Sequence, residues 1–144
     1  MPNASRNAVA GYSSAPLAQK LGIKSGNTVL IRGAPAGYLK SLDPLPPNVR
    51  IAGRLSASVD VAHIFTSDRA ALQKTLAAYR ATLKPTAMVW ASWPKKASGV
   101  PTEITEDVVR RIALAMGFVD VKVCAIDHVW SGLKLVVRKE LRSR

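Results

Sequence analysis

Apolar and polar segments alternate along this sequence in a way that predicts β-strands separated by helices. The apolar runs of strand length are residues 28–33, 48–54, 59–66, 87–93, 119–126 and 133–137. The run 59–66 is apolar except for Asp60 and His63, which is typical of a strand in the middle of a parallel sheet. The run 48–54 contains fewer apolar residues and predicts a weaker strand.

Two longer helices are expected because apolar residues recur at helical spacing. The first follows Ser67 and Asp68, either of which can cap it, and its apolar positions are Leu72, Leu76, Tyr79 and Leu83. The second follows Thr105 as its cap, and its apolar face is Val108, Val109, Ile112, Ala113 and Met116. Two short helices are predicted nearer the N-terminus, over residues 16–22 and 38–42.

This order of elements predicts an α/β protein with a three-layer α/β/α, Rossmann-like fold. The sheet should be mostly parallel, with a C-terminal antiparallel hairpin at one edge. Residues 1–10 are expected to be a disordered lead and residues 11–144 a single domain. Only residues 55–58 connect the second and third strands, whereas a parallel crossover usually takes a dozen or more. The second strand is therefore either short or antiparallel, and the sequence leaves both alternatives open.

Composition adds one unusual property, a strong positive charge. The 144 residues include 21 Lys or Arg against 9 Asp or Glu, which gives a net charge of +12. Such a field favours anionic partners, namely nucleic acid, an acidic protein segment or a small anion, although a basic surface that serves solubility explains it equally well. The single cysteine, Cys124, excludes an internal disulfide, and no membrane span or signal peptide is visible, so we expect a cytoplasmic protein.

Three segments of the chain resemble known sequences. They are GYSSAPLAQKLGIK (residues 11–24), SWPKKASGVPT (residues 92–102) and WSGLKLV (residues 130–136). Together they resemble a small bacterial family of unknown function that is built on the core of class I S-adenosylmethionine-dependent methyltransferases. The resemblance implies a degenerate form of that fold and no established activity.

The chain departs from the methyltransferase pattern where the cofactor would bind. Such enzymes place an acidic residue and a G-x-G turn after the first strand, and an acid for the ribose hydroxyls at the end of the second strand. Here the first turn reads Arg32-Gly33-Ala34-Pro35-Ala36-Gly37, and the second strand ends in Gly53-Arg54. A strand-helix unit between the second and third strands is also missing. We therefore expect no cofactor, with S-adenosylmethionine in an altered pocket as the alternative.

Ligands of open α/β sheets bind beyond the carboxyl ends of the strands, so the segments that follow the strands are candidates. The loop 93–99 combines an aromatic wall, two lysines and a hydroxyl, which suits a phosphate or carboxylate; the alternative is an exposed loop with solvated lysines. We expect the segments after the first, third and fourth strands and the turn 127–132 to surround one crevice. The candidate ligand-binding residues are Gly33, Pro35, Tyr38, Asp68, Trp93, Lys95, Lys96, Ser98, Gly99, Trp130 and Ser131.

No catalytic residue or metal site is predicted. Asp68 is explained by helix capping, His63 by a hydrogen-bonded place in the core, and His128 has no nucleophile that the sequence puts beside it. The sequence therefore favours a non-catalytic binding or regulatory module that accepts a small anionic ligand or an acidic partner. The alternatives are a methyltransferase with an altered cofactor pocket and a basic nucleic-acid-binding protein.

Overall fold

A computed structural model describes residues 15–142 of the chain, so the expected lead over residues 1–10 lies outside the described part. The elements, in chain order, are α1 (Leu17–Lys20), β1 (Thr28–Arg32), α2 (Tyr38–Ser41), β2 (Arg50–Ala52), β3 (Val61–Phe65), α3 (Arg69–Thr82), β4 (Met88–Pro94), the 3₁₀ turn η1 (Lys96–Ser98), α4 (Glu106–Ala115), β5 (Phe118–Ala125), β6 (Trp130–Val137) and the 3₁₀ turn η2 (Lys139–Leu141). No helix among these residues is both long and apolar enough to cross a membrane.

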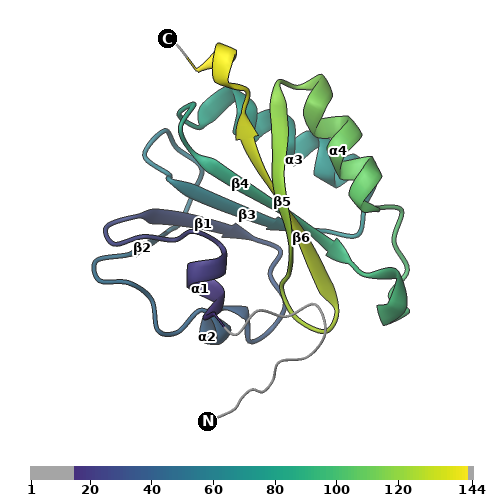
Figure 1. The fold of residues 1–144 in the computed structure, drawn as a ribbon, viewed down its shortest axis with the longest axis horizontal. Coiled ribbons are helices and arrows are strands. Elements are labelled where there is room, and N and C mark those ends of the chain that lie inside the picture. The colour runs from purple at the N-terminus through teal and green to yellow at the C-terminus, as the bar shows by residue number, and fades with distance from the viewer. Residues whose placement is uncertain (1–14, 143–144) are drawn as a thin grey trace.

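All six strands form one sheet in the order β2-β1-β3-β4-β6-β5 (Figure 1). The first four pair in parallel, and β6 is antiparallel to both β4 and β5. The expected α/β fold with a C-terminal antiparallel hairpin is confirmed. The last strand, β6, lies between β4 and β5, so it is inserted into the sheet beside the edge strand.

The pairing of β2 decides between the two alternatives left by the sequence. It is parallel to β1, with Arg50 opposite Thr28, and only three residues long. Residues 53–60 then lead past β1 to β3 without a helix. Eight residues reach at most about 26 Å when extended, which is ample to return along a strand of roughly 10 Å. A short crossover therefore fits because the strand that it follows is short.

Helices cover both faces of the sheet (Figure 1). The predicted helices α3 and α4 pack on one face with Leu72, Leu76, Val109 and Ile112 in the larger of two apolar clusters. The short helices α1 and α2 contribute to a smaller cluster on the other face. The predicted caps are confirmed, since the side chains of Asp68 and Thr105 accept hydrogen bonds from the backbone N–H groups of Ala71 and Val108.

The C-terminal hairpin differs from the prediction in where its turn ends. The turn was expected to extend to Gly132, but β6 begins at Trp130. The carboxylate of Asp127 accepts hydrogen bonds from the N–H groups of Val129 and Trp130, both at 2.8 Å, which closes a tighter turn. Gly132 then lies within the sheet, where a Cβ would stand 2.9 Å from Ser92 Oγ, so a glycine is required by close packing there.

Candidate functional site

The loop after β4 is held in place by its own hydrogen bonds and by the hairpin. The N–H of Lys95 donates to the carbonyl of Val129 at 2.7 Å, which joins this loop to the turn before β6. The hydroxyl of Ser98 donates to the Lys95 carbonyl at 2.7 Å and accepts from the N–H of Val100 at 3.2 Å. The strand β4 thus leads into an ordered loop at the carboxyl edge of the sheet.

A cavity of about 590 Å³ lies between this loop and the start of α4. Trp93 and Ile104, both buried, contribute its apolar surface, and Ser131 on β6 contributes a hydroxyl. The predicted residues Lys95, Lys96 and Gly99 also line it. Two cationic side chains therefore border an apolar hollow, the combination expected from the sequence for loop 93–99.

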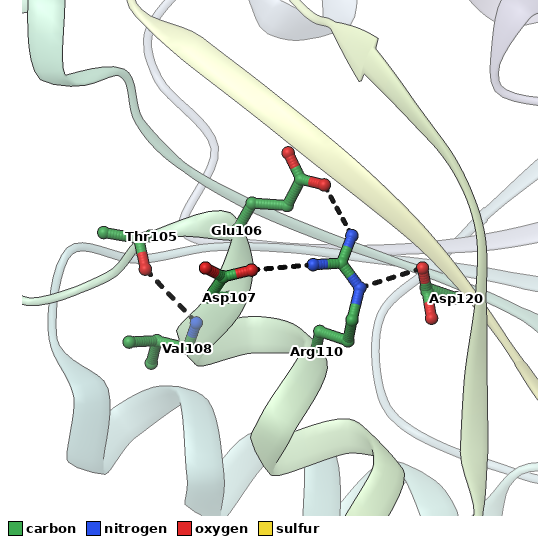
Figure 2. Close-up of polar contacts among 6 residues, drawn as sticks. All are labelled: Thr105, Glu106, Asp107, Val108, Arg110 and Asp120. Carbon is green, nitrogen blue, oxygen red and sulfur yellow. Dashed lines mark hydrogen bonds and ion pairs between the residues drawn. The ribbon is translucent and has the colours of Figure 1, made fainter.

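The opposite side of the cavity is acidic. Glu106 lines it at the first residue of α4 and forms an ion pair with Arg110 (Figure 2). The same guanidinium bonds to Asp107 at 2.9 Å and to Asp120 on β5 at 3.0 Å. Its hydrogen bond to Asp120 lowers the pKa of that carboxyl. Three carboxylates surround one guanidinium, so the cluster keeps a net negative charge, and Glu106 is its member that lines the cavity.

Three of the predicted ligand-binding residues have structural roles and do not line this cavity. Asp68 caps α3, as the sequence analysis allowed. Ser98 bonds within its own loop. Trp130 packs edge-on against the ring of Phe65, with 5.3 Å between ring centroids. The lining residues that the sequence analysis missed belong to the approach to α4, among them Thr102, Ile104, Thr105 and Glu106.

The predicted residues after β1 border a separate cavity. Pro35 and Tyr38 line a hollow of about 570 Å³ together with Ile51 of β2. The expected single crevice is thus two cavities in the structure. Aromatic rings occupy the space toward β6, since Phe65 packs edge-on against both Tyr38 at 4.8 Å and Trp130 at 5.3 Å. Gly33 stands at the end of β1 with φ +73°, where a Cβ would approach the Phe65 carbonyl oxygen to 2.4 Å.

A buried polar chain connects the two parallel strands β3 and β4. Tyr38 Oη lies 2.6 Å from His63 Nδ1, and His63 Nε2 lies 2.6 Å from Ser92 Oγ. Burial lowers the pKa of His63 to about 3 and raises that of Tyr38. The imidazole is therefore neutral, and both contacts are satisfied if Tyr38 donates to Nδ1 and Nε2–H donates to Ser92. The prediction of a hydrogen-bonded core histidine is confirmed, whereas Ser92 was not anticipated.

The comparisons with known proteins bear on the fold. No protein-family model and no curated protein matches the chain. A SAM-dependent methyltransferase from Aquifex aeolicus is similar in structure, with 20% identity, a TM-score of 0.62, and coverage of 83% of this chain and 87% of the other. A proposed type 11 methyltransferase from Sulfolobus solfataricus has 16% identity, a TM-score of 0.61 and coverage of 85% and 90%.

A third similar structure is the magnesium protoporphyrin IX methyltransferase from Synechocystis PCC 6803 with bound SAH. It has 12% identity, a TM-score of 0.52, and coverage of 79% of this chain and 75% of the other. This chain has the class I methyltransferase fold. That conclusion confirms the expected Rossmann-like core, and at these identities it extends to the fold alone.

The methyltransferase fold implies S-adenosylmethionine, but the residues after β1 do not fit it in the usual way. Gly33 is needed because the Phe65 carbonyl occupies the space that a Cβ would take, so this glycine serves the packing of β1 against β3 and not a cofactor. Pro35 has no N–H to donate. None of the residues that line the adjacent cavity carries a carboxylate, and its charged member is Lys40. The carboxylate that usually accepts from the ribose hydroxyls is therefore missing from the lining of this cavity.

Proposed function

We propose that this chain is a ligand-binding protein of methyltransferase fold that accepts a small molecule with one carboxylate or phosphate group. Its binding site is the cavity between the β4 loop and α4. The observation that carries the proposal is the meeting of Trp93, Lys95, Lys96 and Ser131 around one hollow. Its volume, about 590 Å³, falls within the range of small-molecule sites.

The arrangement of the lining residues also orients the ligand. Lys95 and Lys96 line the side of the cavity formed by the β4 loop, and each carries a cationic ammonium group whose three N–H donors attract an anion. Trp93 and Ile104 offer an apolar wall for the remainder of the molecule. Glu106 repels a second anionic group at the far side. A ligand with an anionic end and an apolar body fits this pattern.

We infer binding without catalysis from the chemistry of the lining. The residues around this cavity include no histidine or cysteine, and the carboxylate of Glu106 is already engaged by Arg110. A general base or nucleophile with a partner to activate it is therefore missing from this set. The proposal is a binding or regulatory role, with an acidic protein segment as a competing occupant that the experiment below separates.

The second candidate function is an S-adenosylmethionine-dependent methyltransferase with an altered cofactor pocket, and the comparisons favour it over the first. The Aquifex and Sulfolobus proteins are both described as methyltransferases, and the chain covers 87% and 90% of them. Small size is therefore no argument against this activity. The residues after β1 argue the other way, because the cavity beside them carries no carboxylate for a ribose.

A binding experiment with two ligands and two variants separates these functions. Phenyl phosphate combines one anionic group with an aromatic body, and S-adenosylhomocysteine represents the cofactor. Calorimetry should detect phenyl phosphate binding to the unaltered protein, and the double change Lys95→Ala and Lys96→Ala should abolish it. The matched control, Lys74→Ala and Lys139→Ala, removes the same charge from exposed positions outside the cavity. It should bind as tightly as the original protein.

The other outcomes are equally specific. Micromolar binding of S-adenosylhomocysteine that survives the Lys95 and Lys96 changes would overturn the first function and support the second. Binding of an acidic peptide, with none of either small molecule, would show that the site serves a protein partner. A ligand at 100 times its dissociation constant adds about 2.7 kcal/mol to the free energy of unfolding, so a thermal shift offers an independent readout.

A further inference from the structure

Like charges face each other on the β5–β6 ladder. Lys122 and Lys134 are direct partners in the antiparallel pairing of these strands. Side chains of directly opposite residues lie on the same face of the sheet, and two like charges in that position destabilise it. The pair is therefore a cost to the fold that the rest of the hairpin has to offset.

Two further lysines approach this pair from the N-terminal part of the described chain. Lys20 on α1 donates from Nζ to the carbonyl of Ala125 on β5 at 3.2 Å. A Cβ placed on Gly22 would lie 3.8 Å from Lys134 Nζ, which brings the end of α1 against β6. Lys24 follows two residues later, and its charge acts on Lys134. We refer to Lys20, Lys24, Lys122 and Lys134 as the lysine face.

Half of the lysine face borders a groove of about 510 Å³ between α1 and β5, and Lys24 and Lys134 lie beyond its lining. Lys20 and Lys122 line it together with Gln19, Cys124 and Ser131. No aromatic side chain is among the residues that line this groove. It is distinct from the cavity of the proposed function, although Ser131 borders both.

Carboxylates that could neutralise these lysines are engaged elsewhere. None of the ion pairs found within residues 15–142 includes Lys24, Lys122 or Lys134. Asp120 on β5 is bonded to Arg110 of α4, and Asp127 is bonded to backbone N–H groups in its turn. Burial and then the charges of Lys122 and Lys24 lower the pKa of Lys134, as mutual repulsion requires.

We propose that the lysine face binds the phosphodiester backbone of a nucleic acid without reading its sequence. Lysines contributed by three segments of the chain match a row of phosphates better than one small anion. A recessed groove accommodates a strand of phosphates, whereas a flat membrane surface cannot enter it. Proteins that bind single strands without sequence preference combine a basic groove with aromatic side chains that stack on the bases. This groove is basic but has no aromatic lining residue, so contacts to the bases are not expected. The net charge of +12 adds long-range attraction.

The test compares two variants of equal net charge. Lys122→Gln with Lys134→Gln changes the lysine face, and Lys74→Gln with Lys139→Gln changes exposed lysines on α3 and η2, outside the groove. Fluorescence anisotropy with a mixed-sequence 20-nucleotide RNA and with a DNA duplex is measured from 30 to 200 mM KCl. The unaltered protein should bind at 50 mM and lose binding near 150 mM, because each phosphate contact adds about −0.9 to the salt slope for duplex DNA.

The lysine-face variant should show a salt slope smaller by about two for duplex DNA and an affinity weakened at least fivefold at 50 mM, whereas the control should change by less than twofold. The melting temperature of the lysine-face variant should stay equal or rise, because the repulsion between Lys122 and Lys134 is removed. Equal losses in both variants would show a diffuse field and overturn the proposal. It would also be overturned by a lack of binding at 30 mM, by tighter binding to phosphatidylserine vesicles, or by a lowered melting temperature of the lysine-face variant.

Discussion

The buried histidine links the stability of this protein to pH in a way that one substitution isolates. His63, on β3, is 1% exposed and lies between the side chains of Tyr38 on α2 and Ser92 on β4. Burial lowers its pKa from 6.5 to about 3. The unfolded chain therefore binds a proton to this imidazole at a pH where the folded chain does not. The contribution of the neutral, buried imidazole to stability is fully present above pH 6.5 and is lost progressively as the pH falls toward 3.

The magnitude follows from the width of this window. Each pH unit between the two pKa values corresponds to about 1.36 kcal/mol. At pH 4.5, two units below the unfolded value, the free energy of unfolding should be lower by about 2.7 kcal/mol than above pH 7. A domain of this size has a total stability of about 5–15 kcal/mol, so the change is a substantial part of it.

Other shifted carboxyls act at lower pH and do not mask this effect. Burial acts to raise the pKa of Asp60, but hydrogen bonds from Lys84 and from the N–H of Thr28 outweigh it and lower that pKa overall; the hydrogen bond from Arg110 lowers the pKa of Asp120. Their contribution is present above the ordinary value of 3.8 and is lost as the pH falls through the folded pKa below it. The window between pH 6.5 and 4.5 is therefore where the His63 contribution stands apart.

The variant His63→Gln removes the titration, and its amide carries both an acceptor for the Tyr38 hydroxyl and a donor for Ser92 Oγ. It should lose about 1–2 kcal/mol at pH 7, since the imidazole stacks on Phe65 with 4.0 Å between centroids. Urea unfolding followed by tryptophan fluorescence at pH 7.0, 6.0, 5.0 and 4.5 should then show little further loss. The control His128→Gln removes an exposed imidazole and should keep the wild-type loss. Parallel pH profiles for wild type and His63→Gln would refute the reasoning.

Two further substitutions test how the frame of the site is held. Gly33→Ala should destabilise the protein by about 3 kcal/mol or more, because φ +73° disfavours alanine and its Cβ would meet the Phe65 carbonyl. The control Gly26→Ala, at φ +79° with open space around it, should cost only about 1 kcal/mol. Chemical denaturation measures both losses. Arg110→Met should lower the melting temperature at pH 7 and raise the pKa of Asp120 in an NMR titration, and an unchanged Asp120 would contradict the ion-pair network of Figure 2.

The strands and the two long helices could be predicted because their apolar patterns are strong. The run 59–66 became the fully buried strand β3, and Leu72, Leu76 and Tyr79 became the buried face of α3. The start of β6 at Trp130 could not be predicted, because it depends on the Asp127 carboxylate accepting hydrogen bonds from the N–H groups of Val129 and Trp130. In the sequence, an aspartate that closes a turn in this way cannot be distinguished from any other acidic residue in a loop.

The candidate site was predictable only in part, for a physical reason. Trp93 lies near the end of β4, and Lys95, Lys96 and Gly99 follow that strand directly, so their common location could be inferred from the chain itself. Whether the segment after β1 joins them depends on side-chain packing, which periodicity does not reveal. The rings of Tyr38, Phe65 and Trp130 fill the intervening space. The partner of His63 was missed for a similar reason, since Ser92 stands in an otherwise apolar strand and becomes informative only once β3 and β4 are paired.

The most direct test of the proposed site is to locate a bound ligand on the molecule. Amide NMR spectra of the labelled protein, recorded during titration with phenyl phosphate, should shift residues 95–99 and Ser131 and leave residues 33–38 unchanged. The same titration with S-adenosylhomocysteine should produce no shifts below millimolar concentration. Shifts confined to residues 33–38 and 51–54, at the carboxyl ends of β1 and β2, would contradict the account. They would place the ligand where methyltransferases hold their cofactor.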